Sequence, residues 1–444
     1  MTRTPRCARR SSPFRSRASG SVSPTPRSAA ALAAIALSVL LVGPLLAGLL
    51  AAALAGVVLA DALAARRAPR ARRSVPAVVV RGVPSALHVE LLDADADAGA
   101  DARRRTRVRQ TRVPDVEIVP QEGQGGLQAQ LIARRRGRRV LPAAVARTHG
   151  PLGLASWDHQ VGEPAELLVY PDVPSARRLA LAVRAGRFRE SGRRSRGPLG
   201  LGTEFESIRD YLPDDDIRQV NWAATARLGR PMSNQYRIEQ DRDVICVLDC
   251  GRLMAAPLAD GATRLDVAVD AATAVGIVAD ELGDRCGTLA FDQTIRRRVT
   301  PRRRGGAALV GAVFDLEPEP LDSDYELAFR HVTSSKRALV IVFTDLIEEV
   351  AARSLVEAVP ILARRHEVVV AGVIDPDLDA MLRREPAVEL DVYRSAAALD
   401  VLAARERAAA RVRAAGAHVV ETAPALLGEA CVAAYLRAKS RARL

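Results

Sequence analysis

A carboxylate at the end of an apolar run offers the clearest chemistry in this sequence. Residues 243–249 read Asp-Val-Ile-Cys-Val-Leu-Asp, which predicts a buried strand that ends at Asp249. Asp292, Thr344 and Asp345 follow other short apolar runs. In an open parallel sheet such side chains meet at the carboxyl edge, where ligands bind. Because magnesium prefers about six oxygen ligands in octahedral geometry, this edge predicts at most a weak magnesium site.

A second interpretation stays open for the two weak candidate metal ligands, Asp249 and Asp345. Either carboxylate can cap a neighbouring helix N-terminus or pair with Arg252. The six histidines show no ligand spacing, and the chain has neither a Gly-x-Ser-x-Gly elbow nor a Gly-x-x-x-x-Gly-Lys loop. We therefore expect no catalytic residues, no cofactor and no small-molecule substrate.

Length and charge narrow the class of protein. A chain of 444 residues is too long for one ordinary core and predicts two or three domains. The net charge of +13 is concentrated in residues 1–73, which hold twelve arginines and one acid. No basic stripe interleaved with aromatic residues follows, which argues against nucleic-acid binding. The five cysteines form no Cys-x-x-Cys pair, so we expect reduced thiols.

An uncharged apolar segment near the N-terminus predicts a membrane anchor. Residues 29–60 contain no charge, and a Gly-Pro pair interrupts them near the middle. One straight helix of this length would span roughly 48 Å, beyond the ~30 Å hydrocarbon core of a bilayer. We therefore predict a transmembrane hairpin over 29–65, with both arginine-rich flanks in the cytoplasm. A single tilted span and a cleaved signal peptide are the alternatives.

Changes in composition indicate the rest of the organisation. Residues 1–28, rich in Arg, Ser and Pro, predict a disordered basic tail. Short apolar runs between turn residues predict a β-sandwich over 75–182. Residues 183–240 are expected to be a linker that carries a charged motif. From 241 to 442 candidate strands and helices alternate, which predicts an α/β doubly wound domain.

Within the α/β region, the candidate strands are 243–249, 286–292, 295–300, 338–344, 367–374 and 418–421. The short turn at Asp292-Gln293 predicts that 295–300 runs antiparallel to the strand before it. Longer amphipathic runs predict helices at 264–282, 305–315, 323–332, 349–365, 395–415 and 424–438.

The densest group of charged and aromatic residues precedes the predicted sheet. Its members are Arg209, Asp210, Tyr211, Pro213, Asp215, Asp216, Arg218, Trp222 and Arg227. Because acids and arginines alternate around a proline turn, we favour a structural ion-pair network in which Trp222 is buried. A partner-docking surface is the second interpretation and a catalytic carboxylate pair the third. No histidine or serine is positioned to support catalysis.

These residues resemble a known family. The pattern Arg-Asp-Tyr-x-Pro-x-Asp-Asp-x-Arg over 209–218, followed by Trp-x-Ala-x-Ala-Arg over 222–227, resembles the family called domain of unknown function 58. Gly-Pro-Leu-Gly-Leu at 150–154 fits the same resemblance, whereas Asp214 stands where glycine is usual. The resemblance implies a membrane-anchored protein with a von Willebrand A-like domain, commonly paired with a MoxR-type AAA+ ATPase.

The resemblance also bears on the metal site. A metal-binding domain of the von Willebrand A type carries serines two and four residues after the strand-end aspartate. This chain has Gly251 and Leu253 at those positions, so two oxygen ligands are missing. The departure argues for binding partners without a divalent ion.

We therefore expect a non-enzymatic scaffold or adaptor at the inner (plasma) membrane, with its soluble domains in the cytoplasm. Its von Willebrand A-like domain would bind protein partners, among them a MoxR-type AAA+ ATPase and its client. A metal-dependent adhesion module or hydrolase that uses Asp249 and Asp345 is the alternative. A nucleic-acid binder is a third hypothesis, and it requires affinity that persists without residues 1–73.

Overall fold

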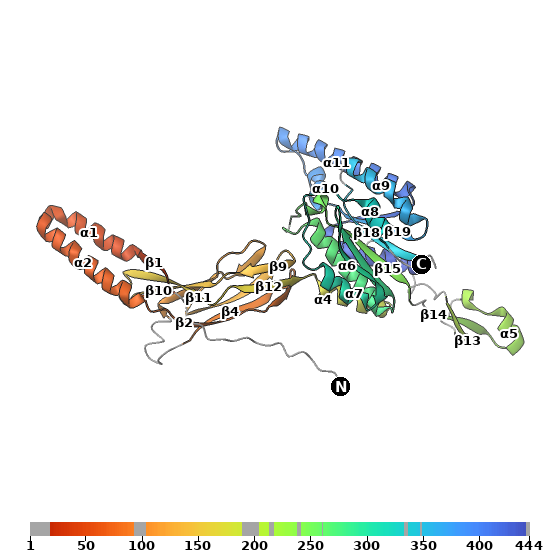
Figure 1. Cartoon of the computed structure of the whole chain (residues 1–444), viewed down its shortest axis with the longest axis horizontal. Helices are drawn as coiled ribbons and strands as arrows, with labels where there is room; N and C mark the ends of the chain where they lie inside the picture. Colours follow the sequence, from red (N-terminus) through yellow and green to blue (C-terminus); the bar gives the residue numbers. More distant parts are fainter. Residues whose placement is uncertain are drawn as a thin grey trace. The chain divides into compact units, whose positions relative to one another are not determined.

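The computed structural model of the chain describes residues 18–92, 104–188, 204–212, 217–237, 241–259, 261–332, 336–346 and 349–440. The chain is multi-domain and divides into two compact units. The first unit ends at Val169 but omits Arg135–Gly137, and the second contains Arg135–Gly137 together with the chain from Tyr170 onwards. Figure 1 shows the elements of both units in sequence colours.

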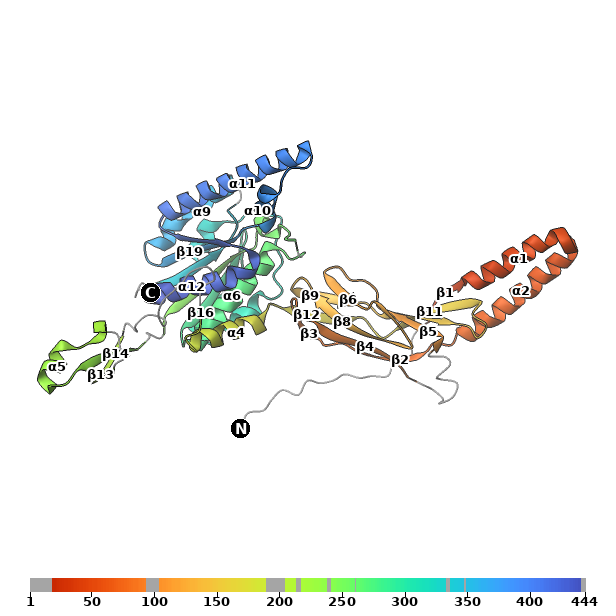
Figure 2. The same ribbon diagram turned by 180° about the vertical axis from the view of Figure 1, so that it is seen from behind.

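Two apolar helices begin the first unit: α1 is Pro26–Val42 and α2 is Pro44–Ala65. Between them Gly43 has a φ of 82°, a left-handed conformation that favours glycine. The break therefore falls at the predicted Gly-Pro pair, and the two helices lie side by side in Figures 1 and 2. By length and composition α2, with 22 residues, can cross a membrane, whereas α1 is shorter at 17 residues.

The segment before α1 corrects the predicted tail. Of residues 1–28, those numbered 1–17 lie outside the described residues, but Ala18–Pro24 form strand β1. This strand pairs antiparallel with β11, Ala155–Val161. Backbone hydrogen bonds to an available strand edge need no apolar side chains, so low hydrophobicity did not reveal the pairing. The prediction of disorder is wrong for 18–28.

The remaining strands of the first unit form three sheets. Their bounds are β2 Arg70–Ser74, β3 Val78–Val80, β4 Ser85–Leu92, β5 Thr106–Arg109, β6 Val116–Val119, β7 Glu122–Gln124, β8 Gly126–Ala133, β9 Gly137–Leu141, β10 Ala144–His149 and β12 Ala165–Tyr170. The sheet orders are β1-β11-β10-β5-β7, β2-β4-β8-β6 and β3-β12-β9. Buried residues from all three sheets share one core, because alternate side chains such as Leu127, Ala129 and Leu131 point inward.

One carboxylate ties α2 to a loop of this unit. Asp61 is buried and accepts hydrogen bonds from the backbone N–H groups of Leu152, Leu154 and Ala155, at 2.8, 2.7 and 2.9 Å. A side chain at Gly150 would lie 2.2 Å from the Asp61 carboxylate, so only glycine fits there. These contacts give the Gly-Pro-Leu-Gly-Leu sequence a structural reason.

A six-stranded sheet forms the centre of the second unit, in the order β17-β16-β15-β18-β19-β20. The strands are β15 Asp243–Asp249, β16 Arg285–Phe291, β17 Ile295–Arg303, β18 Ala338–Phe343, β19 Glu367–Val373 and β20 His418–Thr422. All neighbours are parallel except β16 and β17, which confirms the predicted antiparallel strand. The chain order reverses between β15 and β18, which makes their carboxyl ends a switch point of the kind that binds ligands.

Helices cover both faces of this sheet and bury two apolar clusters. One face packs against α4 Val173–Arg184, α6 Arg264–Glu281, α7 Gly305–Val313 and α12 Leu427–Ser440. The other packs against α8 Tyr325–Arg330, α9 Glu349–Ala363 and α11 Glu389–Ala414. The structure therefore places α4 in the second unit rather than in the predicted β-domain of 75–182.

Two parts of the second unit differ from the prediction. The supposed linker contains a two-stranded antiparallel sheet, β13 Glu204–Asp210 with β14 Met232–Arg237, and between them a short helix, α5 Trp222–Leu228. Its local signals are a cap at Asn221, whose side chain accepts from Ala224 N–H at 2.9 Å, and a left-handed Gly229. The prediction also missed α10, Pro376–Arg383, and placed the start of α11 six residues too late.

Candidate functional site

Asp249 lies at the end of β15, where protein donors surround its carboxylate. One oxygen accepts from Gly251 N–H at 2.8 Å and from the Ser323 hydroxyl at 2.5 Å. The other accepts from the Tyr325 and Thr344 hydroxyls, each at 2.7 Å. Burial raises the pKa of Tyr325 well above its usual range, so the phenol stays protonated and can donate. Four hydrogen bonds thus stabilise a fully buried carboxylate.

Ser323 takes the place of the side chain that position 251 lacks. A Cβ atom built on Gly251 would lie 2.2 Å from Ser323 Oγ and 2.7 Å from the Leu321 carbonyl oxygen. The hydroxyl that serves Asp249 therefore comes from the segment before α8, seventy-four residues away in sequence. Its serine was not predicted, because nothing in the local pattern distinguishes it from an ordinary residue before a helix cap.

Asp345, at the end of β18, is paired with two buried arginines. It contacts Arg264 from α6 in a short ion pair and Arg405 from α11 at 3.2 Å. Arg405 also contacts Glu421 at 3.0 Å and donates to the Val373 carbonyl oxygen at 2.7 Å. Burial raises the pKa of Asp345 to about 6, although both arginines act to lower it.

The structure corrects the predicted pairing with Arg252 and the expectation that the four candidate oxygen ligands meet at this edge. Neither Asp249 nor Asp345 pairs with Arg252, which instead contacts Asp322 at 2.5 Å. Asp292 is held by Arg296 at 2.6 Å and by the Thr294 backbone N–H at 2.8 Å. Of the four candidate oxygen ligands, Asp249 and Thr344 are joined directly, by the hydrogen bond that the Thr344 hydroxyl donates.

These contacts do not fit a divalent cation. Magnesium would need free carboxylate oxygens, yet both oxygens of Asp249 accept two protein hydrogen bonds each. The charge of Asp345 faces two guanidinium groups, which occupy the role a metal ion would have in neutralising it. A cluster of three or more His, Cys, Asp or Glu side chains suited to a metal is not found among the described residues.

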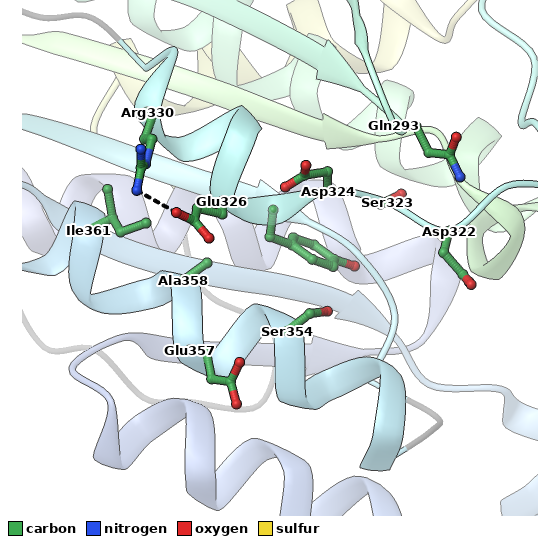
Figure 3. A pocket seen from close by; sticks show the side chains of 11 residues that line it. Gln293, Asp322, Ser323, Asp324, Glu326, Arg330, Ser354, Glu357, Ala358 and Ile361 are labelled. Carbon is green, nitrogen blue, oxygen red and sulfur yellow. Dashed lines mark hydrogen bonds and ion pairs between the residues drawn. The ribbon is translucent and has the colours of Figure 1, made fainter.

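A cavity of about 800 Å³ lies beside this edge, between the segment that precedes α8 and the helix α9 (Figure 3). Its lining includes four acids, namely Asp322, Asp324, Glu326 and Glu357. Figure 3 shows Glu326 paired with Arg330, which also lines the cavity. A smaller recess of about 270 Å³ reaches Asp249 and Arg252. The acidic walls disfavour anionic ligands such as nucleic acid.

The charged motif lies on the segment 204–237, which we call the docking segment. Trp222 begins α5 and is 69% exposed, so the prediction that it is buried is wrong. Other large apolar side chains of this segment are also exposed: Ile208, Leu212, Ile217 and Leu228. Two strands of seven and six residues and a seven-residue helix offer too little interior to enclose an indole.

The predicted ion-pair network is only partly visible. Pro213, Asp215 and Asp216 lie outside the described residues, as does the side chain of Arg218. Asp210 pairs with Arg230 at 3.2 Å, and Arg209 donates to the Asp210 carbonyl oxygen at 3.0 Å.

The other two members of the motif differ in exposure. Tyr211 is half-buried and its backbone N–H donates to the Pro231 carbonyl oxygen at 3.0 Å, whereas Arg227 is exposed. Arg230 was not among the predicted residues, and its signal was only its proximity to the motif.

In a comparison with known proteins, one family model matches the region that contains most of the docking segment and the carboxyl edge of the central sheet. Residues 207–422 match the model of the family described as protein of unknown function DUF58. Residues 207–422 of the chain belong to the DUF58 family. The match begins within β13 and ends with β20, so it includes most of the docking segment and the whole carboxyl edge of the sheet. The resemblance inferred from residues 209–218 and 222–227 is confirmed.

The curated relatives of this chain are named as uncharacterized proteins. Uncharacterized proteins of Mycobacterium bovis and of two strains of Mycobacterium tuberculosis are each 26% identical over 186 residues. The match covers 40% of this chain and 56% of each relative, so the chain spans about half the length of the curated relatives it matches.

Solved structures give only distant likenesses. A point mutant of the PilB minor pilin from Streptococcus sanguinis matches 82% of this chain and 85% of its own, at 7% identity and a TM-score of 0.32. An uncharacterized membrane spanning protein from Vibrio fischeri matches 30% of this chain and 71% of its own, at 18% identity and a TM-score of 0.14. Scores this low do not establish a shared fold.

Proposed function

We propose that this DUF58 protein is a membrane-anchored, non-enzymatic scaffold whose α/β region binds protein partners without a metal ion. The observation that carries the proposal is the exposed Trp222 on the docking segment. Tryptophan supplies large binding energies when an interface covers it, and it is enriched among the residues that dominate such interfaces. Exposed leucines and isoleucines and several charged groups lie on the same segment as Trp222, which is the composition of an interface core with a polar rim.

The carboxyl edge of the sheet supports the metal-free part of the proposal. The order and direction of the strands support the von Willebrand A-like domain that we propose, and Asp249 stands at the switch point. Hydroxyl and backbone donors stabilise that carboxylate, and arginines neutralise Asp345. The carboxylates of this edge already have protein partners. We therefore propose that a protein partner is recognised through surface shape, apolar contacts and charge rather than through a metal ion.

The helical pair supports the anchor. Leucines on α1 and α2 are among the most exposed large apolar side chains, including Leu37, Leu45 and Leu49. Exposed leucines are unfavourable in water and suited to lipid. We propose that α1 and α2 form a membrane hairpin that leaves the sheets of both units in the cytoplasm, because arginines flank both ends.

The resemblance to the family suggests a MoxR-type AAA+ ATPase as the partner. The test is a cross-linking pull-down from membranes with the intact chain and with Trp222→Ala. We expect recovery of such an ATPase, identified by mass spectrometry, to fall about tenfold in the variant and to be unchanged by a metal chelator. Leu181→Ala, which removes an exposed leucine from α4, is the matched control and should leave recovery intact.

Two results would contradict the proposal. Equal recovery of the ATPase with the intact chain and with Trp222→Ala would show that the docking segment is not part of the interface. Recovery that disappears on chelation would favour the alternative, a metal-dependent adhesion module or hydrolase built on Asp249 and Asp345.

A further inference from the structure

We propose that the projecting pair of helices α10 and α11 is a second docking surface, and that it binds a basic amphipathic helix of a partner protein. The surface consists of α10 and the first part of α11, residues 376–399, which we call the antenna. It is separate in sequence from the docking segment. It rests on the proposed function only in that both surfaces recognise proteins.

The antenna is held to the domain at one end only. Helix α11 has 26 residues, but its buried residues begin at Ala398 and continue through Arg405 to Val412. No residue of α10 is buried. Figure 2 shows α11 extending beyond α9, with α10 beside its first half. Ser395 Oγ donates to the Met381 carbonyl oxygen at 3.3 Å and joins the two helices.

Large apolar side chains are exposed along this projection. Tyr393 is 72% exposed and Leu399 57% exposed, and Val388, Leu390, Val392 and Met381 are exposed as well. Positions 392, 396 and 399 hold Val, Ala and Leu at helical spacing, which makes one apolar stripe along α11. An exposed apolar stripe of this kind, accompanied by charged residues, is typical of an interaction site.

The net negative charge of the antenna indicates which kind of ligand it binds. Residues 375–400 hold seven acids and three arginines, for a net charge of −4, in a chain whose net charge is +13. Two of those arginines are paired within the antenna, Arg383 with Asp379 and Arg394 with Asp391. Glu385, Glu389 and Asp400 are exposed around the apolar stripe. The complementary ligand therefore has an apolar stripe bordered by Lys or Arg, and a helix is the form that fits a two-helix surface.

The same charges disfavour two other occupants. A bilayer with anionic lipids repels an acidic helix, whereas helices that bind such surfaces are rich in Lys and Arg. A second copy of the antenna would bring like charges together, which costs affinity. We therefore assign the surface to a basic partner helix.

The experiment uses the full chain in nanodiscs of phosphatidylcholine and a fluorescent Leu–Lys peptide of roughly 15 residues with helical spacing. Anisotropy should report binding by the chain, and neither empty nanodiscs nor a matched Leu–Glu peptide should produce it. Leu399→Asp should weaken binding at least ~10-fold, because it places a charge in the apolar stripe. Leu181→Asp adds the same charge at a position with 58% exposure on α4, and it should not change binding.

Hydrogen exchange supplies the second readout. Bound Leu–Lys peptide should slow exchange of the backbone amides of 376–399, because the antenna has few tertiary contacts to protect it. Equal binding of both peptides, unchanged affinity in Leu399→Asp, or protection confined to other segments would overturn the proposal. Concentration-dependent dimerisation through 376–399, or binding of the antenna to lipid, would overturn it in favour of those occupants.

Trp222→Ala separates this inference from the proposed function. It should leave peptide binding unchanged while it lowers partner recovery. If peptide binding is lost in Trp222→Ala and kept in Leu399→Asp, the peptide occupies the docking segment and the antenna inference fails alone.

Discussion

The carboxyl edge of the central sheet buries its carboxylates, whereas the docking segment exposes several large apolar side chains. At the edge, Asp249 and Asp345 are buried, and each has several protein partners. On the docking segment, Trp222 is exposed and the helix that carries it buries none of its residues. A buried polar network contributes to the stability of the domain, whereas an exposed apolar group contributes only when a partner covers it. We therefore expect substitutions at the edge to change stability and substitutions on the docking segment to change binding.

The largest effect is expected from Arg405→Ala. The variant leaves the buried Asp345 with one arginine and removes the contact to Glu421, so the free energy of unfolding should fall by about 3–5 kcal/mol. Chemical denaturation of the full chain in detergent measures this change. Arg407→Ala, at an exposed position two residues along α11, is the control and should change stability by less than about 0.5 kcal/mol. Equal losses of unfolding free energy in the two variants would show that the pairing of Arg405 with Asp345 and Glu421 does not stabilise the domain.

A pH dependence follows from Asp345. Because burial raises its pKa to about 6, the folded state keeps a proton that the unfolded state releases near pH ~3.9. This contribution is present below pH ~4 and is lost as the pH rises through about 6. Relative to Asp345→Asn, which cannot titrate, the unfolding free energy should fall by up to about 3 kcal/mol from pH ~4 to pH ~7. A difference that stays constant or grows over this range would contradict the assignment.

Restoring a serine after the strand should harm the domain rather than create a site. Gly251→Ser places a side chain against Ser323 and the Leu321 carbonyl oxygen, so we expect a loss of about 1–3 kcal/mol in thermal or chemical unfolding. Combination with Ser323→Gly should recover part of this loss, because it removes the nearest of the two clashes. A neutral Gly251→Ser would indicate that the volume beside Asp249 is free.

The smallest change in stability is expected from Trp222→Ala. Because the side chain is exposed, the free energy of unfolding should change by less than about 0.5 kcal/mol. The same variant is expected to lower partner recovery. A large loss of stability would show that Trp222 belongs to a core and that the contrast between the two regions is wrong.

The sequence predicts the centre of the sheet in the second unit well because β15, β18 and β19 are nearly continuous apolar runs. The expected strand at 243–249 matches β15 in both bounds, and the hairpin turn correctly predicts the direction of β17. Helices α6 and α9 also lie where their apolar spacing places them. Buried runs of this length have few other conformations that satisfy their backbone and side chains together.

Features that depend on distant partners could not be predicted. The Ser323 contact to Asp249 joins segments that are far apart in sequence, and Arg264 and Arg405 meet Asp345 from different helices. Strand β1 depends on pairing with β11 rather than on its own composition. The exposure of Trp222 was missed because residue type predicts burial only on average, and a small two-stranded segment has little interior.

The most direct test of the central claim is calorimetric titration of magnesium into the full chain at neutral pH, with Asp249→Ala titrated in parallel. If the carboxyl edge is satisfied by its own hydroxyls and arginines, the intact chain should give no heat above that of the variant and should keep its melting temperature in a chelator. Micromolar magnesium binding by the intact chain that Asp249→Ala abolishes would contradict the account.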